Sequence, residues 1–257
     1  MAELTQRDVA YEANGTRMIG CLVASAAAPG GCVGAPLPGI LLVHDAFGLG
    51  ADTIALAARY AKLGYAVFAA DVWGERTEAH DGADIGRLIG SMVGDRDDWM
   101  ARLAAAHEAA AAQPEFDADR TVIVGACFGG SSALEYVRTG APVVAAVSIH
   151  GGLDLVAHDW SAATGSATVL LCTGADDPMA APEHWQPVKA GLTGAGLDWE
   201  FDLYSGTQHA FTNPKADALG MPGAASHPRN AARAWARTID FLGEVTGAAA
   251  GIRTSAR

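Results

Sequence analysis

The sequence predicts an α/β fold, in which a mostly parallel, twisted sheet carries helices on both faces. Two observations lead to this class. Short β-rich apolar runs alternate with stretches of helical spacing along the chain, and this alternation is typical of parallel strands joined by crossover helices. The chain also has 257 residues, a length that α/β folds commonly use for one domain. We therefore expect a single domain over residues 1–257.

The expected strands are short apolar runs, as strands buried on both faces are. The expected helices have apolar residues at helical spacing, and residues 52–63 also begin at an N-cap candidate and end before Gly64. Strands are expected at residues 39–44, 65–70, 121–125, 143–150 and 168–173, with an exposed edge strand at 198–204. Helices are expected at residues 52–63, 99–112, 128–138 and 230–245.

Two segments have the composition of irregular chain. Residues 23–38 are rich in Ala, Gly and Pro and are expected to form a surface loop. Residues 248–257 are expected to be a flexible tail.

The charge balance limits the classes of partner. The formal net charge is -12, and an acidic surface repels nucleic acid phosphates and anionic lipid heads. No apolar run approaches the roughly 20 residues of a membrane span, and the start lacks the pattern of a signal peptide. We expect a cytoplasmic monomer or homodimer that acts on a small molecule and binds neither nucleic acid nor membrane.

The cysteines do not form a metal or disulfide pattern. The four are Cys21, Cys32, Cys127 and Cys172, and no two form a CxxC pair. So few cysteines in a chain of this length do not indicate a disulfide framework. No HExxH motif is present either. We expect neither a metal nor another cofactor.

The most specific local motif is GACFGG at residues 125–130, which matches G-x-S-x-G with Cys127 in place of Ser. A β-rich run precedes it and a helical run follows it. So sharp a strand-to-helix turn strains the central residue, and the flanking glycines leave room for neighbouring backbone. The helix N-terminus favours a thiolate. Cys127 could instead be a small buried hydrophobe, but its context favours a nucleophile.

A cysteine nucleophile needs a base, and the base needs an orienting acid. α/β-Hydrolases arrange the three in the chain order nucleophile, acid, histidine. His209 follows the last expected strand, although it could be an ordinary exposed loop histidine. The acid is expected after residues 168–173, where Asp176 and Asp177 lie in a turn. Spacing alone does not decide between these two carboxylates.

Several motifs together resemble the dienelactone hydrolase family, over residues of about 5 to 245. The resemblance implies an α/β-hydrolase fold with a Cys–His–Asp triad. It also selects Asp177 as the acid, because members usually have a single Asp before Pro in this turn, and it implies an oxyanion hole from the backbone N–H groups of Ala46 and Phe128. The motifs are VHDAFGL (43–49), AADVWG (69–74), GACFGG (125–130), HGG (150–152), GADDP (174–178) and HAFTNP (209–214).

The chain departs from the best-known members at two substrate positions. Asp45 stands where those members have Glu, which is thought to hold the thiol until substrate arrives. Asn213 stands where they have an Arg that clamps the substrate carboxylate, and Asn cannot supply a charge or a bidentate fork. Arg76 or Arg87 could replace that charge, although both could be ordinary surface arginines. Trp73, in the 69–74 motif, is also expected near the substrate.

These residues predict hydrolysis of a small ester or lactone through a cysteinyl thioester. The same triad could serve a thioesterase, an acyltransferase or a general carboxylesterase, because fold analogy does not separate these. A non-catalytic thiol sensor or binding module is a further alternative. The presence of both a histidine and an acid argues against it, because a sensor needs no complete triad.

Overall fold

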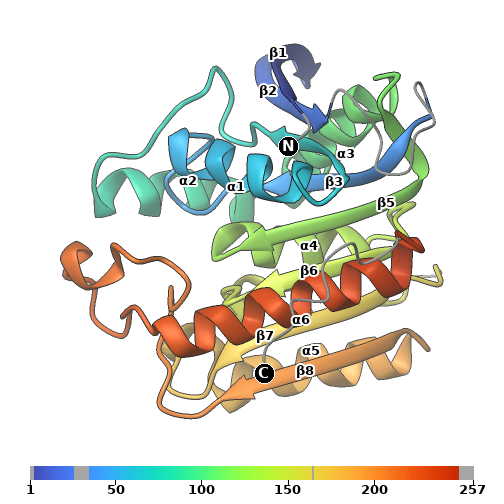
Figure 1. Ribbon diagram of the computed structural model, residues 1–257. Helices are drawn as coiled ribbons and strands as arrows, with labels where there is room; N and C mark the ends of the chain where they lie inside the picture. The colour runs from blue at the N-terminus through green and yellow to red at the C-terminus, as the bar shows by residue number, and fades with distance from the viewer. Residues whose placement is uncertain (1–2, 26–34, 164, 249–257) are drawn as a thin grey trace, which may run out of the picture.

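The strands form one eight-stranded sheet in the computed structural model, which describes residues 3–25, 35–163 and 165–248 (Figure 1). The order is β1-β2-β4-β3-β5-β6-β7-β8. β2 pairs antiparallel with β1 and β4, and all other neighbours are parallel. The strands are β1 (Leu4–Ala13), β2 (Thr16–Ser25), β3 (Leu37–Val43), β4 (Ala66–Ala70), β5 (Phe116–Ala126), β6 (Ala145–Ile149), β7 (Thr168–Gly174) and β8 (Asp198–Tyr204).

Helices cover both faces of this sheet, which confirms the predicted fold class. α1 and α6 pack on one face, and α3, α4 and α5 pack on the other (Figure 1). The α-helices are α1 (Ala51–Ala61), α2 (Gly82–Gly94), α3 (Arg96–Ala111), α4 (Phe128–Arg138), α5 (Pro182–Gly194) and α6 (Pro228–Thr246). Three short 3-10 helices are η1 (Leu153–Leu155), η2 (Pro178–Ala180) and η3 (Ala216–Leu219).

The sequence did not predict the β1–β2 hairpin, because its first strand is polar and mostly exposed. Asn14 and Gly15 both have positive φ, at 48° and 76°, in the turn that joins the strands. Asn-Gly is the residue pair that such two-residue hairpin turns favour. The hairpin is tied to the rest of the sheet because the Tyr11 hydroxyl donates to the carbonyl of Asp71 at 2.8 Å.

The predicted loop over residues 23–38 is wrong at both ends. Ala24 is fully buried within β2, and Leu37 begins β3 with 7% of its surface exposed. Both strands are buried, so the small and apolar residues at the two ends of this segment belong to the sheet and not to a surface loop. The middle of the segment, residues 26–34, and the predicted tail over residues 249–257 lie outside the described residues.

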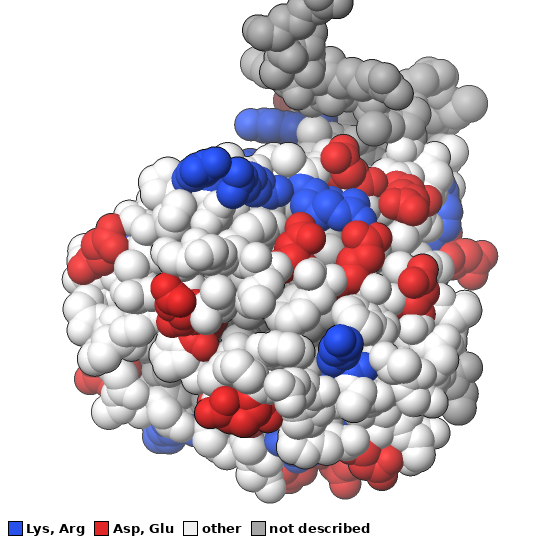
Figure 2. All heavy atoms as spheres, turned by 90° about the horizontal axis from the view of Figure 1, so that it is seen from below, with Lys and Arg blue, Asp and Glu red and all other residues white. Residues whose placement is uncertain are grey.

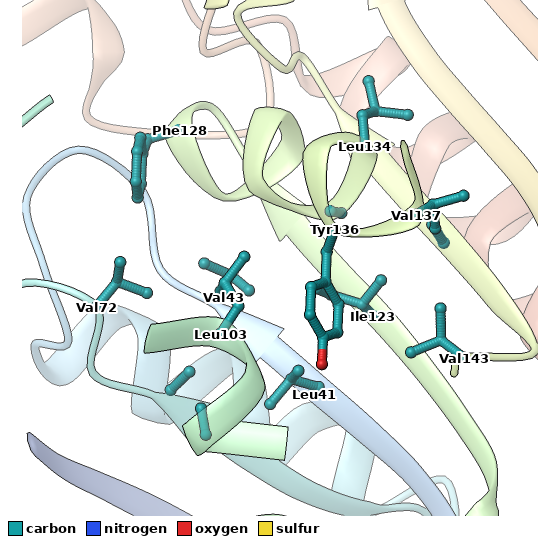
Figure 3. Close-up of a cluster of buried hydrophobic side chains, with 14 of the residues drawn as sticks. Leu41, Val43, Val72, Leu103, Ile123, Phe128, Leu134, Tyr136, Val137 and Val143 are labelled. Carbon is teal, nitrogen blue, oxygen red and sulfur yellow. The ribbon is translucent and has the colours of Figure 1, made fainter. Parts of the chain in front are cut away.

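A cluster of apolar side chains packs between α3, α4 and the sheet (Figure 3). Leu41 and Val43 of β3 and Ile123 of β5 contribute from the sheet side. Phe128, the first residue of α4, is 1% exposed and stacks on Trp99 with ring centroids 5.1 Å apart. The first turn of α4 therefore rests on the core, which makes it a rigid support for the residue just before it.

One fully buried carboxylate holds the far end of α4. Glu135 accepts hydrogen bonds from Arg96 at 2.7 Å, from Arg138 at 2.8 Å and from the backbone N–H of Ala157 at 2.7 Å. A buried charge is tolerated only when it is paired and hydrogen-bonded in this way. The network joins α4 to the start of α3 and to the chain after η1.

The surface mixes both signs of charge. On the face in Figure 2, acidic and basic side chains are interspersed with uncharged areas. Among the residues that the structure describes, no helix has the length and apolar character needed to cross a bilayer.

Candidate active site

Cys127 sits between the end of β5 and the start of α4, with a strained backbone at φ 53° and ψ -122°. The flanking glycines are needed for close packing. A Cβ on Gly125 would lie 2.2 Å from the backbone of Gly129, and one on Gly129 would lie 2.3 Å from the carbonyl oxygen of Val43. The predicted strain and the predicted role of the glycines are both confirmed.

The structure brings Cys127, His209 and Asp177 together from three distant segments. The Sγ of Cys127 lies 3.2 Å from Nε2 of His209. The Nδ1 of His209 lies 2.8 Å from Oδ2 of Asp177. His209 follows β8, and Asp177 follows β7. Parallel strands bring their carboxyl ends to the same edge of a sheet, so chain segments 82 residues apart meet there.

The acid is held in place by its own turn. Oδ1 of Asp177 accepts the backbone N–H of Met179 at 2.8 Å, which leaves Oδ2 for the histidine. Asp177 is 2% exposed and contacts the histidine, whereas its neighbour Asp176 is exposed. The geometry thus favours Asp177 of the two carboxylates that spacing left open.

His209 is arranged to carry a proton. Burial opposes a charge on its ring, but the hydrogen bonds to Asp177 and Cys127 outweigh burial and raise its pKa to about 10. The side chain has 3% exposure, so little water screens these bonds. A histidine held between a carboxylate and a thiol can take the thiol proton and keep it beside the sulfur.

Ala46 and Phe128, whose backbone N–H groups the family resemblance implies as the oxyanion hole, lie at the same edge of the sheet. Ala46 follows β3, Phe128 follows β5, and these two strands are neighbours. The ring centroids of Phe128 and His44 are 6.1 Å apart, so the start of α4 lies close to the chain after β3. His44 fixes the first loop, since its Nδ1 donates to the carbonyl of Asp45 at 2.7 Å and its Nε2 accepts from Val72 at 3.1 Å.

Asp45 bonds its own loop rather than the thiol. Its Oδ1 accepts the backbone N–H of Phe47 at 2.9 Å. Burial raises the pKa of Asp45, although this hydrogen bond opposes the rise. The thiol faces His209 instead, so the structure shows no direct contact through which Asp45 would hold Cys127.

A cleft of about 610 Å³ opens between α1 and α6, and we call it the α1–α6 cleft. Asp45 and Asn213 line it, as does His150, whose Nδ1 accepts from the backbone N–H of Cys127 at 3.2 Å. The cleft therefore reaches the neighbourhood of the nucleophile. Its apolar floor and walls include Leu42, Leu56, Val124, Ile149 and Trp235.

Neither Arg76 nor Arg87 lines the α1–α6 cleft. Arg76 turns away from the cleft, because its guanidinium pairs with Asp8 and bonds the backbone of β2. Arg87 is exposed on α2 and pairs with Asp84. Trp73 is also not a cleft residue, because it is buried against the ring of Phe128 at 4.4 Å.

Two other cationic side chains line the cleft, and no motif in the sequence pointed to either of them. Arg59 of α1 lies 3.8 Å over the ring of Trp235, and Lys215 pairs with Asp52 at 2.6 Å. With Asp45, the lining holds two acidic and two basic side chains. The local charge of the cleft is thus close to balanced.

The remaining cysteines have different surroundings. Cys21 is buried in β2 and Cys172 in β7. Cys32 lies outside the described residues. Cys172 is thus a core residue of its strand.

A strained elbow between a parallel strand and a helix, with an acid and a histidine after later strands, places the protein in the α/β-hydrolase class. The sequence profile of the dienelactone hydrolase family matches residues 23–246, most of the chain. The chain belongs to the dienelactone hydrolase family and is a carboxylic ester hydrolase.

Known proteins resemble this chain at two levels. A crystal structure of a dienelactone hydrolase-like promiscuous phosphotriesterase from metagenomic libraries superposes with a TM-score of 0.87 and 34% identity, covering 95% of this chain and 99% of that one. A protein of Yersinia pestis named "Putative carboxymethylenebutenolidase" is 26% identical over 215 residues, which span 80% of this chain and 78% of that protein. A protein of the same name from Salmonella typhimurium is 27% identical over 219 residues, covering 82% and 78%.

Proposed function

We propose that this protein hydrolyses a small ester or lactone through an acyl thioester on Cys127. The observation that carries the proposal is the continuous contact from Asp177 through His209 to Cys127, at 2.8 and 3.2 Å. A nucleophile, a base within hydrogen-bond reach and an acid that orients the base are the parts that covalent acyl transfer requires.

In the first half-reaction, His209 takes the thiol proton and the Cys127 sulfur attacks the carbonyl carbon of the substrate. The carbonyl oxygen becomes an oxyanion, which the N–H groups of Ala46 and Phe128 stabilise. The intermediate collapses and expels the alcohol oxygen, which takes the proton from His209. The enzyme then carries the acyl group as a thioester.

In the second half-reaction, a water molecule gives a proton to His209 and attacks the thioester carbon. The carbon–sulfur bond breaks, the carboxylic acid leaves, and Cys127 recovers its proton. Asp177 keeps the imidazole in the tautomer whose Nε2 faces the sulfur throughout.

The substrate class follows from the charge of the cleft. A carboxylate-bearing lactone needs a cation to offset its desolvation. Asn213 supplies none, and in the cleft the charges of Arg59 and Lys215 are balanced by Asp45 and Asp52. We propose that neutral esters or lactones serve at least as well as the anionic dienelactone.

The test is steady-state turnover of a panel that contains a dienelactone, neutral lactones and aryl esters. Intact mass spectrometry of the enzyme with a slow aryl ester should show one acyl group, mapped to the peptide that contains Cys127. An ester that turns over without any adduct on this cysteine, also in Cys127→Ala, would refute the covalent mechanism.

Two outcomes separate the alternatives on the same triad. A primary alcohol or amine added to the assay should not divert the acyl group from water, because the proposal is a hydrolase. Efficient transfer to the added acceptor would favour an acyltransferase, and preference for thioesters over oxygen esters would favour a thioesterase. A complete absence of turnover across the panel would favour the thiol sensor or binding module.

A further inference from the structure

Another buried histidine lies beside the nucleophile and its base. His150 directly follows β6, has 3% exposure and adopts a left-handed backbone with φ 39°. Its Nδ1 lies 3.2 Å from the backbone nitrogen of Cys127, whose N–H is shared with the carbonyl of Ile149 at 3.0 Å. Its Nε2 lies 2.8 Å from Oγ1 of Thr212. A buried residue in a strained conformation with both ring nitrogens engaged is held there by specific contacts.

The two contacts determine the tautomer of His150. A backbone N–H can only donate, so Nδ1 must be the acceptor and carry no proton. The neutral ring then has its hydrogen on Nε2, which donates to Oγ1 of Thr212. Burial, together with the nearby His209, lowers the pKa of His150 well below its ordinary value, in agreement with a neutral ring.

His150 thereby contacts both the segment that carries the nucleophile and the segment that carries the base. Cys127 is the strained residue of the elbow, and Thr212 lies three residues after His209 on the loop that carries the base. The ring of His150 also meets that of His209 edge-on, with centroids 5.2 Å apart. One side chain thus joins the strand end that presents the sulfur to the loop that presents the imidazole.

We propose that His150 is a positioning residue that sets the distance between Sγ of Cys127 and Nε2 of His209, and that the Thr212 hydroxyl fixes the tautomer this task requires. Without that hydroxyl, the ring can place its hydrogen on Nδ1, where it would oppose the N–H of Cys127 and break the tie. This inference rests on the proposed chemistry of Cys127.

The experiment compares Thr212→Val, which keeps the shape and removes the hydroxyl, with Thr212→Ser, which keeps the hydroxyl. Displacing a reacting group by about 1 Å can cost roughly 100-fold in rate. We expect Thr212→Val to lower kcat about 10-fold with KM within about twofold, and Thr212→Ser to recover most of that loss. His150→Phe, which keeps a ring of similar size but loses both contacts, should lower kcat by about 100-fold.

The alkylation rate of Cys127 by iodoacetamide supplies a readout without substrate, and it should fall in the same order. The matched control is His107→Phe. His107 is a buried histidine of α3, on the other face of the sheet, and its Nδ1 lies 3.2 Å from the Tyr136 hydroxyl. This change should lower the melting temperature and leave kcat unchanged.

The outcomes separate the two proposals. If Thr212→Val and His150→Phe keep wild-type kcat while Cys127→Ala is inactive, the positioning role is wrong and the proposed function stands. Equal losses in Thr212→Val and Thr212→Ser also overturn the role of the hydroxyl. If Cys127→Ala still turns over substrate, the proposed function itself fails. Should His150→Phe not fold, the Thr212 pair still decides the question.

Discussion

Cys127 and Cys172 differ in their place in the sheet: Cys127 lies at the end of one strand and Cys172 in the interior of another. β5 and β7 flank the same strand, β6, yet their cysteines differ in every relevant property. Cys172 is fully buried, its sulfur accepts from the Tyr204 hydroxyl at 3.8 Å, and burial raises its pKa to about 12. Cys127 lies just past its strand, partly exposed, with its sulfur 3.2 Å from an imidazole nitrogen. Position relative to the strand end, rather than residue type, makes a thiol usable.

The largest expected effect tests this comparison directly. Cys127→Ala should lower kcat/KM by on the order of a thousandfold or more, because it removes the covalent step. Cys172→Ala should leave kcat/KM within a few fold and cost about 1 kcal/mol of unfolding free energy. Assays on one aryl ester, with melting temperatures of both variants, provide the measurement. If Cys127→Ala kept a tenth of the wild-type activity, Cys127 would not be the nucleophile.

Labelling sharpens the same contrast. Native protein treated with iodoacetamide should be modified on the Cys127 peptide and inactivated, with substrate protecting it. The Cys172 peptide should remain unmodified until the protein is unfolded, because its thiol is shielded and kept protonated.

Asp176 and Asp177 are adjacent carboxylates that differ in the same way, since one is exposed and the other is buried beside the histidine. Asp177→Asn should lower kcat by at least about 100-fold, because an amide cannot stabilise the imidazolium or hold its tautomer. Asp176→Asn should change kcat by no more than a few fold, since its side chain is exposed. Steady-state rates of both variants measure this. Equal losses would reverse the assignment of the acid.

The charge of the α1–α6 cleft should decide between anionic and neutral substrates. Asn213→Arg should raise kcat/KM for an anionic lactone about 10-fold relative to a neutral one, as one charge-assisted contact is worth about 1.5–3 kcal/mol. The ratio of the two kcat/KM values in each enzyme is the measurement. A wild-type preference of a hundredfold for the anionic lactone would contradict the neutral cleft and point to Arg59 as the cation.

The smallest expected effect is a shift in pH dependence. The hydrogen bond from Asp177 helps to raise the pKa of His209 to about 10, above its ordinary value of 6.5. The proton on His209, and the stability it gives, are therefore present below pH 6.5 and lost as the pH rises through about 10. Asp177→Asn should move the alkaline limb of kcat/KM to lower pH. An unmoved limb in the residual activity would mean that another group titrates there.

The sequence predicted those parts of the site that depend on local signals. α4 begins and ends where the helical spacing indicated, and β8 is the edge strand that its alternation indicated. The elbow is recognisable because its strain requires glycines at fixed offsets. Asp177, by contrast, required a family resemblance, because two carboxylates in one turn look alike until the fold buries one.

What the sequence did not reveal depends on contacts between distant segments. His150 was visible as part of a motif, but its task depends on Cys127 and Thr212, which approach it only in the folded chain. Arg59 carries no local sign of its place over Trp235. The cleft itself is a space between α1 and α6, and no residue pattern in either helix specifies how far apart they lie.

The buried carboxylate of Glu135 has a consequence for how this protein can evolve. Arg96 and Arg138 both pair with it, so removal of any one member would disrupt a buried ion-pair network on the helix that follows the elbow. Each single substitution is therefore expected to be selected against, whereas the simultaneous replacement of all three by apolar residues is not. Among relatives, positions 96, 135 and 138 should be retained together or lost together, so this trio should act as one inherited unit.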